Sequence, residues 1–328
     1  MPDSNIIDIH CHTAGIGAGG SGCFVSPALR NSWKFPVYLR SYGVTETELR
    51  REGDGLVIRR LSETLAGSHW VSRAVVLAMD AVIGGNGEAD AGRTELFIPN
   101  EFVSGEVRRY PNLLYGASIN PYRRDALERL ERAAAEGAVL VKWLPAIQEI
   151  DPADKRLVPF YCRLAELGLP LLTHTGEEGS FTRTRNELGD PERLRLPLAQ
   201  GVTVIAAHGA SNGRNAGERN HDRFIRLAAL FPNLCADISA LTQLNRIGHL
   251  KRLLRHKELH GRLLYGTDMP LIETGITSPW FHAYCLSPGT ARRLAAIVNP
   301  WDRDVALKRE LGMTEEIFGN SARLLVKI

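Results

Sequence analysis

The chain alternates between short apolar runs and amphipathic, charged stretches. Eight apolar runs are predicted to form strands, at residues 6–12, 72–80, 111–119, 138–144, 169–174, 201–208, 232–238 and 261–268. Most are separated by stretches with the periodicity of helices, at residues 100–109, 125–136, 154–167, 222–231 and 244–256. Runs that are apolar throughout are typical of parallel strands covered on both faces. The pattern therefore predicts an α/β protein with the (β/α)8 architecture of a TIM barrel.

The lengths of the connections support this prediction. Segments that lead into the strands are short turns, such as residues 109–112 and 231–233. Segments that leave the strands are long and rich in Gly, Asn, Asp and Arg, at residues 13–55, 81–98, 145–153, 176–190, 209–220 and 269–289. Loops at the C-terminal ends of the strands carry function in this fold. We expect a single barrel over residues 1–328, with these loops enlarged and an elaborated first connection at about residues 13–67.

Ionisable side chains finish several of the predicted strands. They are His10 and His12 on the first strand, Lys142 on the fourth, His174 on the fifth, His208 on the sixth and Asp268 on the eighth. Each would be costly to bury without a partner, and all would converge on one mouth of the barrel. Nitrogen and carboxylate ligands of this kind suit zinc or another divalent transition metal at about 2.0 to 2.2 Å, with one position left open for water.

The opening run, residues 6–12, ends in two histidines one residue apart. Because side chains alternate along a strand, His10 and His12 are expected on one face with Asp8, while Cys11 points outward toward a helix. A His-x-His pair alone is weak evidence, since such pairs are more often on the surface or hydrogen-bonded in the core. The pair becomes evidence for a metal site only together with the other ionisable residues at strand ends.

Plainer interpretations exist for several ionisable residues. The strand-end His and Asp side chains could be core groups that hydrogen-bond to the backbone. Lys142 could pair with a neighbouring carboxylate, and Asp8 could be a structural acceptor. His249, His256 and His260 stand among Lys and Arg residues, which predicts a solvated helix face.

A glycine-rich stretch follows the first strand. Gly17, Gly19 and Gly22 match the G-x-G-x-x-G pattern of dinucleotide-binding folds, in which a helix opens at the third glycine. Here Cys23 to Pro27 follow instead, so we predict a mobile loop. A dinucleotide-dependent oxidoreductase remains an alternative, as does a non-catalytic barrel that serves as a scaffold.

Composition narrows the choice of partner. The 328 residues carry 40 basic and 37 acidic side chains, which gives a net charge of +3. This charge is too small to favour binding to nucleic acid or to a membrane surface. A small-molecule substrate is expected, and homo-oligomerisation is left open. The start lacks the pattern of a signal peptide, and no apolar run reaches the length of a membrane span. Five scattered cysteines without a Cys-x-x-Cys motif indicate reduced thiols, so we expect a cytoplasmic protein.

Six short motifs give the chain a family resemblance. They are Asp-Ile-His-Cys-His at 8–12, Val-Lys-Trp-Leu-Pro at 141–145, Thr-His-Thr-Gly at 173–176, Ala-His-Gly at 207–209, Tyr-Gly-Thr-Asp at 265–268 and Ile-Phe-Gly-Asn-Ser-Ala-Arg-Leu-Leu at 317–325. With these motifs in this order along the chain, the sequence resembles the amidohydrolase superfamily over nearly its whole length. It is most similar to the amidohydrolase-related branch, which includes aminocarboxymuconate-semialdehyde decarboxylase, resorcylate decarboxylases and lactone hydrolases.

The resemblance implies a set of metal ligands. It implies a divalent ion, with zinc favoured, bound by His10, His12, His174 and Asp268. His208 would lie beside the metal-bound water. Binuclear members of the superfamily bridge two ions with a carbamylated lysine at the position of Lys142, although the related branch usually uses one ion, which we favour.

The expected reaction is hydrolysis of a C–O or C–N bond in a small compound that bears a carboxylate. Metal-activated water would attack, with Asp268 or His208 as the base that takes its proton. Non-oxidative decarboxylation is the alternative within the same family. Decarboxylases of this branch typically have Glu two residues before the first metal histidine, where this chain has Asp8, and this difference favours hydrolysis.

Candidate substrate-binding residues lie in the strand-end segments. Arg183 and Arg185 follow His174, and Arg214 follows His208. Since the planar guanidinium matches a carboxylate in a bidentate pair, at least one of the three is expected to hold the substrate. The alternative is that they are solvated charges that balance nearby glutamates. Trp143, beside Lys142, is a further candidate for substrate contact.

Overall fold

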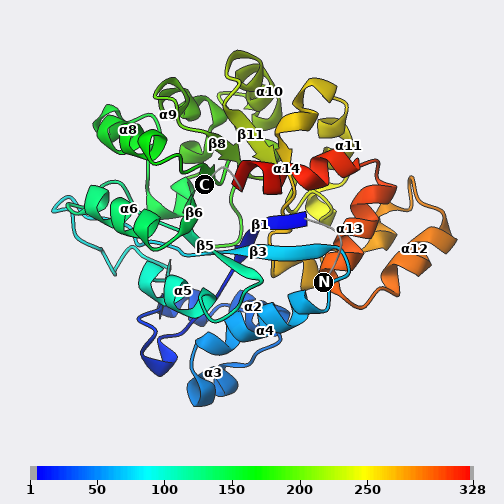
Figure 1. The fold of residues 1–328 in the computed structure, drawn as a ribbon, viewed down its shortest axis with the longest axis horizontal. Helices are drawn as coiled ribbons and strands as arrows, with labels where there is room; N and C mark the ends of the chain where they lie inside the picture. Colours follow the sequence, from blue (N-terminus) through cyan, green and yellow to red (C-terminus); the bar gives the residue numbers. More distant parts are fainter. Residues whose placement is uncertain (1–5, 326–328) are drawn as a thin grey trace.

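Eight parallel strands form the centre of the molecule in the computed structural model, which describes residues 6–325 (Figure 1). In spatial order they are β1 (Ile6–His12), β3 (Val71–Leu77), β5 (Leu113–Ala117), β6 (Ala138–Trp143), β7 (Leu171–Thr173), β8 (Val204–Ala206), β11 (Leu234–Asp237) and β12 (Leu263–Leu264). All eight lie within or near the predicted runs, because each is a short apolar segment buried on both faces.

The last strand returns to the first. The backbone N–H of Ile9 donates to the carbonyl of Tyr265 at 3.1 Å, and that of Asp268 donates to the carbonyl of His10 at 2.9 Å. These bonds bring β12 and the residues after it alongside β1, so the sheet forms a nearly closed barrel. The predicted TIM-barrel fold is confirmed.

Helices surround the barrel. They include α5 (Asn100–Val107), α6 (Ala126–Ala135), α7 (Pro145–Gln148), α8 (Val158–Glu166), α9 (Arg195–Ala199), α10 (Asn220–Leu230), α11 (His249–Leu254), α12 (Pro288–Ala295) and α13 (Pro300–Glu310). In α6 the spacing of buried Ala126, Leu130 and Ala133 produces one apolar face against the barrel. The helix predicted at 244–256 is shorter than expected, because Gly248 has a φ of 82° and α11 begins only after it.

The core has two layers. Side chains inside the barrel include Ile7, Ile9, Leu140, Leu172 and Ile205. A larger outer layer packs between the strands and the surrounding helices. The last helix, α14 (Glu315–Leu325), adds Ala322 and Leu325 to the inner layer and lies across the centre of the barrel in Figure 1. This helix closes the end opposite the long loops.

The first connection forms a substructure of its own. It contains β2 (Phe24–Val25), α1 (Pro27–Arg30), α2 (Lys34–Ser41), α3 (Glu46–Glu52) and α4 (Gly55–Ala66). A separate apolar cluster holds these helices together, and its members include Phe35, Leu39, Leu49, Leu56 and Val57. β2 pairs in antiparallel fashion with β4 (Leu96–Phe97), which ties this segment to the loop after β3. A second small ribbon, β9 (Arg214–Asn215) with β10 (Glu218–Arg219), follows β8.

The glycine-rich stretch does not have the arrangement of a dinucleotide site. The backbone N–H groups of Ile16 and Gly17 donate to the carboxylate of Asp54, at 2.9 to 3.0 Å. After Gly22 the chain enters β2 rather than a helix. The donors that would face a pyrophosphate are therefore occupied by a side chain of the protein itself, which argues against the oxidoreductase alternative.

β1 departs from strict alternation, and the expected position of Asp8 is wrong. Its pairing with β3 shifts register between Asp8 and Cys11. As a result Ile9 and His10 both face the barrel interior, whereas Asp8 and Cys11 face outward. Asp8 accepts a hydrogen bond from the indole N–H of Trp301 on α13, at 2.9 Å. Cys11 does pack outward, as predicted.

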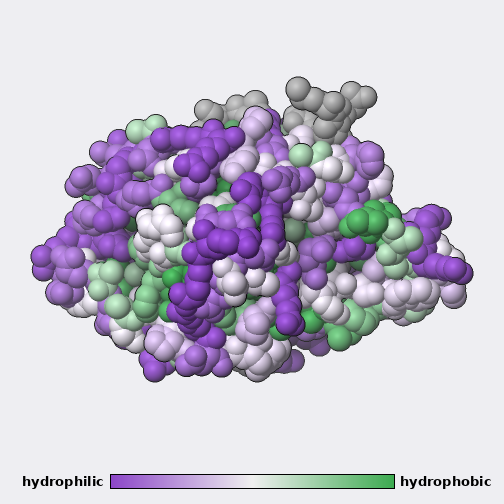
Figure 2. Space-filling view, turned by 90° about the horizontal axis from the view of Figure 1, so that it is seen from below, coloured by the Kyte–Doolittle hydropathy of each residue, from purple (hydrophilic) through white to green (hydrophobic). Residues whose placement is uncertain are grey.

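The surface and the cysteines add little to the functional argument. No helix within residues 6–325 has the length and apolar character that a membrane crossing requires. Hydrophilic side chains cover most of the face in Figure 2, with hydrophobic residues in small groups between them. All five cysteines are free: Cys11, Cys23 and Cys235 are buried, and Cys162 and Cys285 are exposed.

Candidate metal centre and substrate cavity

Three of the predicted ligands meet at the C-terminal ends of the strands. His10 Nε2 lies 3.2 Å from His12 Nε2 and 3.4 Å from Asp268 Oδ1, and His12 Nε2 lies 3.2 Å from the same Asp268 oxygen. Donor atoms bound to one ion at about 2.1 Å in tetrahedral geometry are about 3.4 Å apart. The donor set therefore fits one divalent cation.

Asp237, at the end of β11, orients His10. Its Oδ2 accepts a hydrogen bond from His10 Nδ1 at 2.7 Å, which leaves the Nε2 lone pair directed at the cluster. Burial would raise the pKa of Asp237, but the charge and hydrogen bond of His10 outweigh it and hold that pKa well below its usual range. Burial and the positive charge of Lys142 lower the pKa of His10 to about 4. A neutral imidazole held by a carboxylate is the usual arrangement of a metal-binding histidine.

Sequence reasoning missed Asp237. It ends an apolar run at 232–238 in the same way as the residues that were selected. A search for ionisable residues at the end of every predicted strand would have found it.

Two site residues have backbone conformations that are unusual outside glycine. His208 has a φ of 57° and Asp268 a φ of 64°. The N–H of His208 donates to Asp237 Oδ1 at 2.8 Å, and the N–H of Asp268 donates to the His10 carbonyl at 2.9 Å. Such conformations cost energy and persist where surrounding bonds fix them, which occurs most often at functional sites.

His208 lies beside the cluster with one ring nitrogen occupied. Its Nδ1 is 3.1 Å from the Ser239 carbonyl and 2.8 Å from Ser239 Oγ. Nδ1–H donates to that carbonyl, so Nε2 carries the lone pair. Burial, followed by the charge of Arg246, holds the pKa of His208 well below 6.5. The imidazole is thus neutral at pH 7 and able to accept a proton.

Lys142 reaches the same cluster from β6. Its Nζ lies 2.9 Å from His10 Nε2, and no carboxylate within residues 6–325 forms an ion pair with it. Burial lowers the pKa of Lys142 to about 8, against the opposing charges of Asp237 and Asp268. Part of the amine is therefore neutral near pH 8.

His174, the fourth ligand implied by the resemblance, lines the same cavity. Its Nδ1 is 3.4 Å from Glu178 Oε2, and its ring centroid is 5.2 Å from that of His208. Burial lowers the pKa of His174. Its Nε2 is buried and has no hydrogen-bond partner among the described residues, so a partner from outside the chain would satisfy it.

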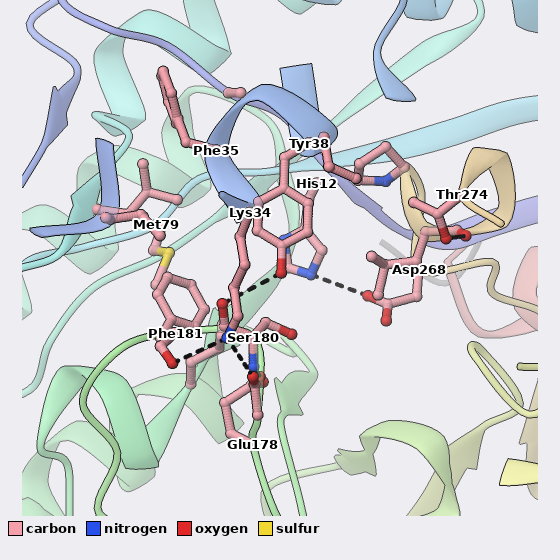
Figure 3. Close-up of a pocket in the computed structure, with 18 of the residues that line it drawn as sticks. His12, Lys34, Phe35, Tyr38, Met79, Glu178, Ser180, Phe181, Asp268 and Thr274 are labelled. Atoms are coloured by element: carbon pink, nitrogen blue, oxygen red, sulfur yellow. Dashed lines mark hydrogen bonds and ion pairs between the residues drawn. The ribbon is translucent and has the colours of Figure 1, made fainter. Parts of the chain in front are cut away.

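A cavity of about 690 Å³ opens onto these residues. His12, His174, His208 and Asp268 contribute its polar part, and its walls are largely apolar, with Leu29, Phe35, Tyr38, Tyr42, Met79 and Phe181 among them. Figure 3 shows α2 docked on the loop after β7. There Lys34 Nζ donates to the Gly179 carbonyl at 2.9 Å, and the Tyr38 hydroxyl donates to the Ser180 carbonyl at 3.3 Å.

None of the predicted substrate-binding residues lines this cavity. Arg183 and Arg185 are exposed, and Arg185 donates to Glu187 at 3.0 Å. Arg214 is exposed and donates to the Gly217 carbonyl at 2.7 Å. Trp143 is fully buried on the outer side of β6, where its indole N–H donates to the Ile119 carbonyl at 2.7 Å. Strand alternation explains this, because Lys142 points inward and its neighbour must point outward.

Arg246 is the buried arginine at the cavity. Only 7% of it is exposed, and its guanidinium donates to Ser211 Oγ at 3.0 Å and to Gln243 Oε1 at 3.1 Å. Within residues 6–325 it forms no ion pair. A buried charge that is bonded only to neutral groups and lines a cavity indicates an anionic ligand.

The sequence matches the amidohydrolase family model over residues 7–298. The chain belongs to the amidohydrolase family. This confirms the resemblance drawn from the motifs, and members of the family are metal-dependent enzymes, both hydrolases and decarboxylases. A search among curated proteins found no significant match.

Solved structures show the same fold in distant relatives of this amidohydrolase. A TIM-barrel protein of unknown function from Bordetella bronchiseptica has a TM-score of 0.59 and 18% identity, covering 98% of this chain and 99% of its own. Amidohydrolase 2 from Bifidobacterium longum subsp. infantis has a TM-score of 0.56 and 16% identity, covering 99% of both chains. A variant of 5-carboxyvanillate decarboxylase from Novosphingobium aromaticivorans, solved with manganese and a nitrobenzoic acid, has a TM-score of 0.51 and 12% identity, covering 96% of both chains.

Proposed function

We propose that this amidohydrolase is a metal-dependent hydrolase that cleaves a C–O or C–N bond in a small molecule bearing a carboxylate. The observation that carries the proposal is the cluster of His10, His12 and Asp268, whose donor atoms lie 3.2 to 3.4 Å apart at the base of a cavity of about 690 Å³. Family membership supports metal dependence.

The proposal gives a separate role to each residue at the site. His10, His12 and Asp268 would hold a divalent ion, which would supply the Lewis acidity that polarises a carbonyl and activates water. Asp237 fixes the tautomer of His10 through the 2.7 Å bond to Nδ1. His208 is neutral, with Nδ1 committed to Ser239, so its Nε2 is the base that takes the proton of the attacking water. Asp268 is the alternative base.

The proposed cofactor is one zinc ion, with His174 as a further ligand through its unpartnered Nε2. A second ion would need a carbamylated Lys142, and the lowered pKa of this lysine is compatible with that reaction. Metal analysis of wild type and Lys142→Ala decides between the two. One ion per chain in both proteins supports a single site. Two ions in wild type and one in Lys142→Ala would contradict it.

The proposed substrate is an apolar or aromatic acid. Arg246 provides the charge for its carboxylate, and the side chains of Phe35, Met79 and Phe181 provide apolar contact for its body. The relative from Novosphingobium aromaticivorans was solved with a benzoic acid derivative, which supports an acid of this kind.

Decarboxylation is less well supported by the site. The family's decarboxylases typically have a glutamate at the position of Asp8, and here Asp8 faces away from the cluster. It accepts hydrogen bonds from Trp301 Nε1 and from the N–H and hydroxyl of Thr267, at 2.5 to 3.0 Å. These contacts make Asp8 a structural acceptor outside the barrel.

Activity assays test the proposed reaction. The protein, loaded with zinc or manganese, is presented with two panels. The first contains esters, lactones and amides that also carry a free aryl carboxylate, and the second contains aryl carboxylic acids without a hydrolysable bond. The proposal expects hydrolysis in the first panel, loss after chelation and recovery on adding metal. Release of CO2 from the second panel, with no hydrolysis in the first, would overturn it in favour of decarboxylation.

A further inference from the structure

A second cavity, of about 630 Å³, lies on the far side of the loop that follows His208. Three arginines line it, Arg214, Arg219 and Arg252, together with His221 and His249 and one acid, Glu177. His249 was expected on a solvated helix face, but it is partly buried and lines this cavity. The lining contains no aliphatic side chain among the described residues, in contrast to the first cavity.

The arginines of this cavity lack counter-charges. Within residues 6–325 none of the three forms an ion pair, although Arg223 and Arg226, nearby on α10, both pair with Glu218. Since Glu177 is exposed and also unpaired, the lining carries a surplus of two positive charges with neutral histidines. A cavity lined mainly by charges of one sign attracts ions of the opposite sign, which favours an anionic occupant.

The two histidines point to the same conclusion independently. His221 Nε2 and His249 Nδ1 are both buried and have no hydrogen-bond partner among the described residues. His221 is only 3% exposed, and its other nitrogen, Nδ1, is 3.3 Å from the Gly209 carbonyl. Buried polar atoms of this kind normally have a partner. Because the Nδ1–H of His221 faces the Gly209 carbonyl, Nε2 would donate to a bound anion after taking up a proton, which the charge of that anion would favour.

We propose that this second cavity binds the phosphate group of a small hydrophilic molecule, or phosphate itself. A phosphate monoester carries a charge of about −1.5 to −2 at pH 7, which matches the surplus of two, whereas a carboxylate would neutralise only half of it. Guanidinium groups bind phosphate oxygens in bidentate pairs. The site also lies at the N-terminal end of α10, where the helix dipole favours an anion, because Arg219 immediately precedes this helix and His221 is its second residue.

A metal ion does not fit this cavity. The His, Cys, Asp and Glu side chains close enough together to hold an ion are found at the first site, and neither His221 nor His249 belongs to such a group among the described residues. Three arginines would also repel a cation. The second site is therefore distinct in chemistry from the metal centre, and the proposal does not depend on the reaction proposed there.

The two sites share a wall. Asn212 lines both cavities, and Ser211, which lines the second, accepts the hydrogen bond from Arg246 of the first at 3.0 Å. A phosphate bound in the second cavity would thus contact the loop that positions the buried arginine of the first.

Calorimetric titration of the full-length protein at constant ionic strength tests the proposal. The probes are inorganic phosphate, glycerol phosphate and acetate, and the variants are Arg252→Ala and Arg219→Ala. Arg255→Ala is the matched control, because Arg255 is exposed at the end of α11 and does not line the cavity. We expect saturable binding of one phosphate or phosphomonoester per chain, weakened at least about tenfold in either cavity variant and less than about twofold in the control. Arg219 is exposed, so its variant serves if Arg252→Ala fails to fold.

Each outcome of the titration bears on the proposal. Tighter binding of glycerol phosphate supports a phosphorylated metabolite, and tighter binding of inorganic phosphate supports the free ion. Absence of saturable binding, equal binding of acetate, or equal loss in Arg255→Ala would overturn the proposal. Loss of binding on chelation alone would also overturn it, because phosphate would then be bound at the metal centre.

Discussion

At the scale of single residues, Arg246 is a buried charge that forms no ion pair within the described part of the chain. Replacing it with alanine would remove the proposed partner of a substrate carboxylate. We expect kcat/KM for an anionic substrate to fall at least about tenfold, equivalent to about 1.4 kcal/mol of transition-state stabilisation. Steady-state kinetics with the acid and its neutral methyl ester check this, since the ester should be much less affected.

Arg185→Ala is the matched control for this prediction. Arg185 is exposed, pairs with Glu187 and does not line the cavity, so its loss should change kcat/KM less than about twofold. Equal effects of the two variants, or an equal loss for the acid and its ester in Arg246→Ala, would contradict the assignment.

Asp237 gives a second prediction at this scale, because it would act on a bound metal through His10. Asp237→Asn keeps the shape but no longer fixes the Nδ1–H tautomer of His10. Loss of such a partner typically lowers metal affinity about 10- to 100-fold. Competition with a chromophoric chelator measures this affinity directly. Asp222→Asn, an exposed acid on α10, should have no effect, and unchanged affinity in Asp237→Asn would refute the role.

The sequence revealed some site residues and concealed others for physical reasons. His10, His12 and Asp268 were predictable because a polar residue that ends an apolar strand has few structural explanations. Arg246 was not, because it lies in a segment with a helical pattern, and its burial depends on Ser211, which is 35 residues away in the chain. The arginines chosen instead lie in the right loops, but their side chains point to solvent or to the second cavity.

At the scale of elements, Gly266 lets the segment after β12 pass close to His10 of β1. A Cβ added at Gly266 would lie 3.1 Å from His10 Cβ and 3.2 Å from Ser239 Cβ. Gly266→Ala should therefore displace both residues and lower the free energy of unfolding by about 1 to 3 kcal/mol, with weaker metal binding. Denaturant unfolding and metal titration are the measurements.

Gly261→Ala is the control for this substitution. No atom lies within 4 Å of a Cβ at Gly261, so the change should leave metal affinity unaltered and raise the free energy of unfolding by about 0.4 to 1 kcal/mol. If Gly266→Ala behaved in the same way, the proposed crowding at His10 would be wrong.

Some secondary-structure elements could be predicted from the sequence and others could not. The strands were found because their apolar runs are continuous, but the bulge in β1 was not, since a local change of register leaves no mark on a buried sequence. The helix α13 was missed because it buries charges: Asp304 and Lys308 are paired at 2.7 Å, and Lys308 also donates to the Gly266 carbonyl at 2.8 Å. A helix that buries charged residues lacks the apolar face on which sequence patterns depend.

At the scale of the whole molecule, burial of neutral histidines makes stability depend on pH. The pKa values of His10 and His249 are lowered to about 4, and those of His174 and His208 are lowered as well, each mainly by burial. Below pH 6.5 the unfolded chain takes up protons that the folded protein does not. Stability is therefore present at neutral pH and is lost as the pH falls from about 6.5 toward 4.

The expected size of this effect can be measured. Each such histidine contributes up to about 1.4 kcal/mol per pH unit in this range, so the metal-free protein should lose at least about 2 kcal/mol between pH 7 and pH 5. Burial raises the pKa of Asp8, which stabilises the folded protein as the pH falls. This opposing effect comes from one group, whereas four histidines act in the other direction. Urea unfolding at the two pH values, with chelator present, checks the prediction. Equal or greater stability at pH 5 would contradict it.

The central claim is that one divalent ion is bound by His10, His12 and Asp268, and elemental analysis of protein purified without chelator tests it most directly. Wild type and His69→Ala, which alters an exposed histidine, should contain about one equivalent of metal per chain. The double variant His10→Ala, His12→Ala should be folded by circular dichroism and contain almost none. A metal-free wild type, or stoichiometric metal in the double variant, would contradict the claim.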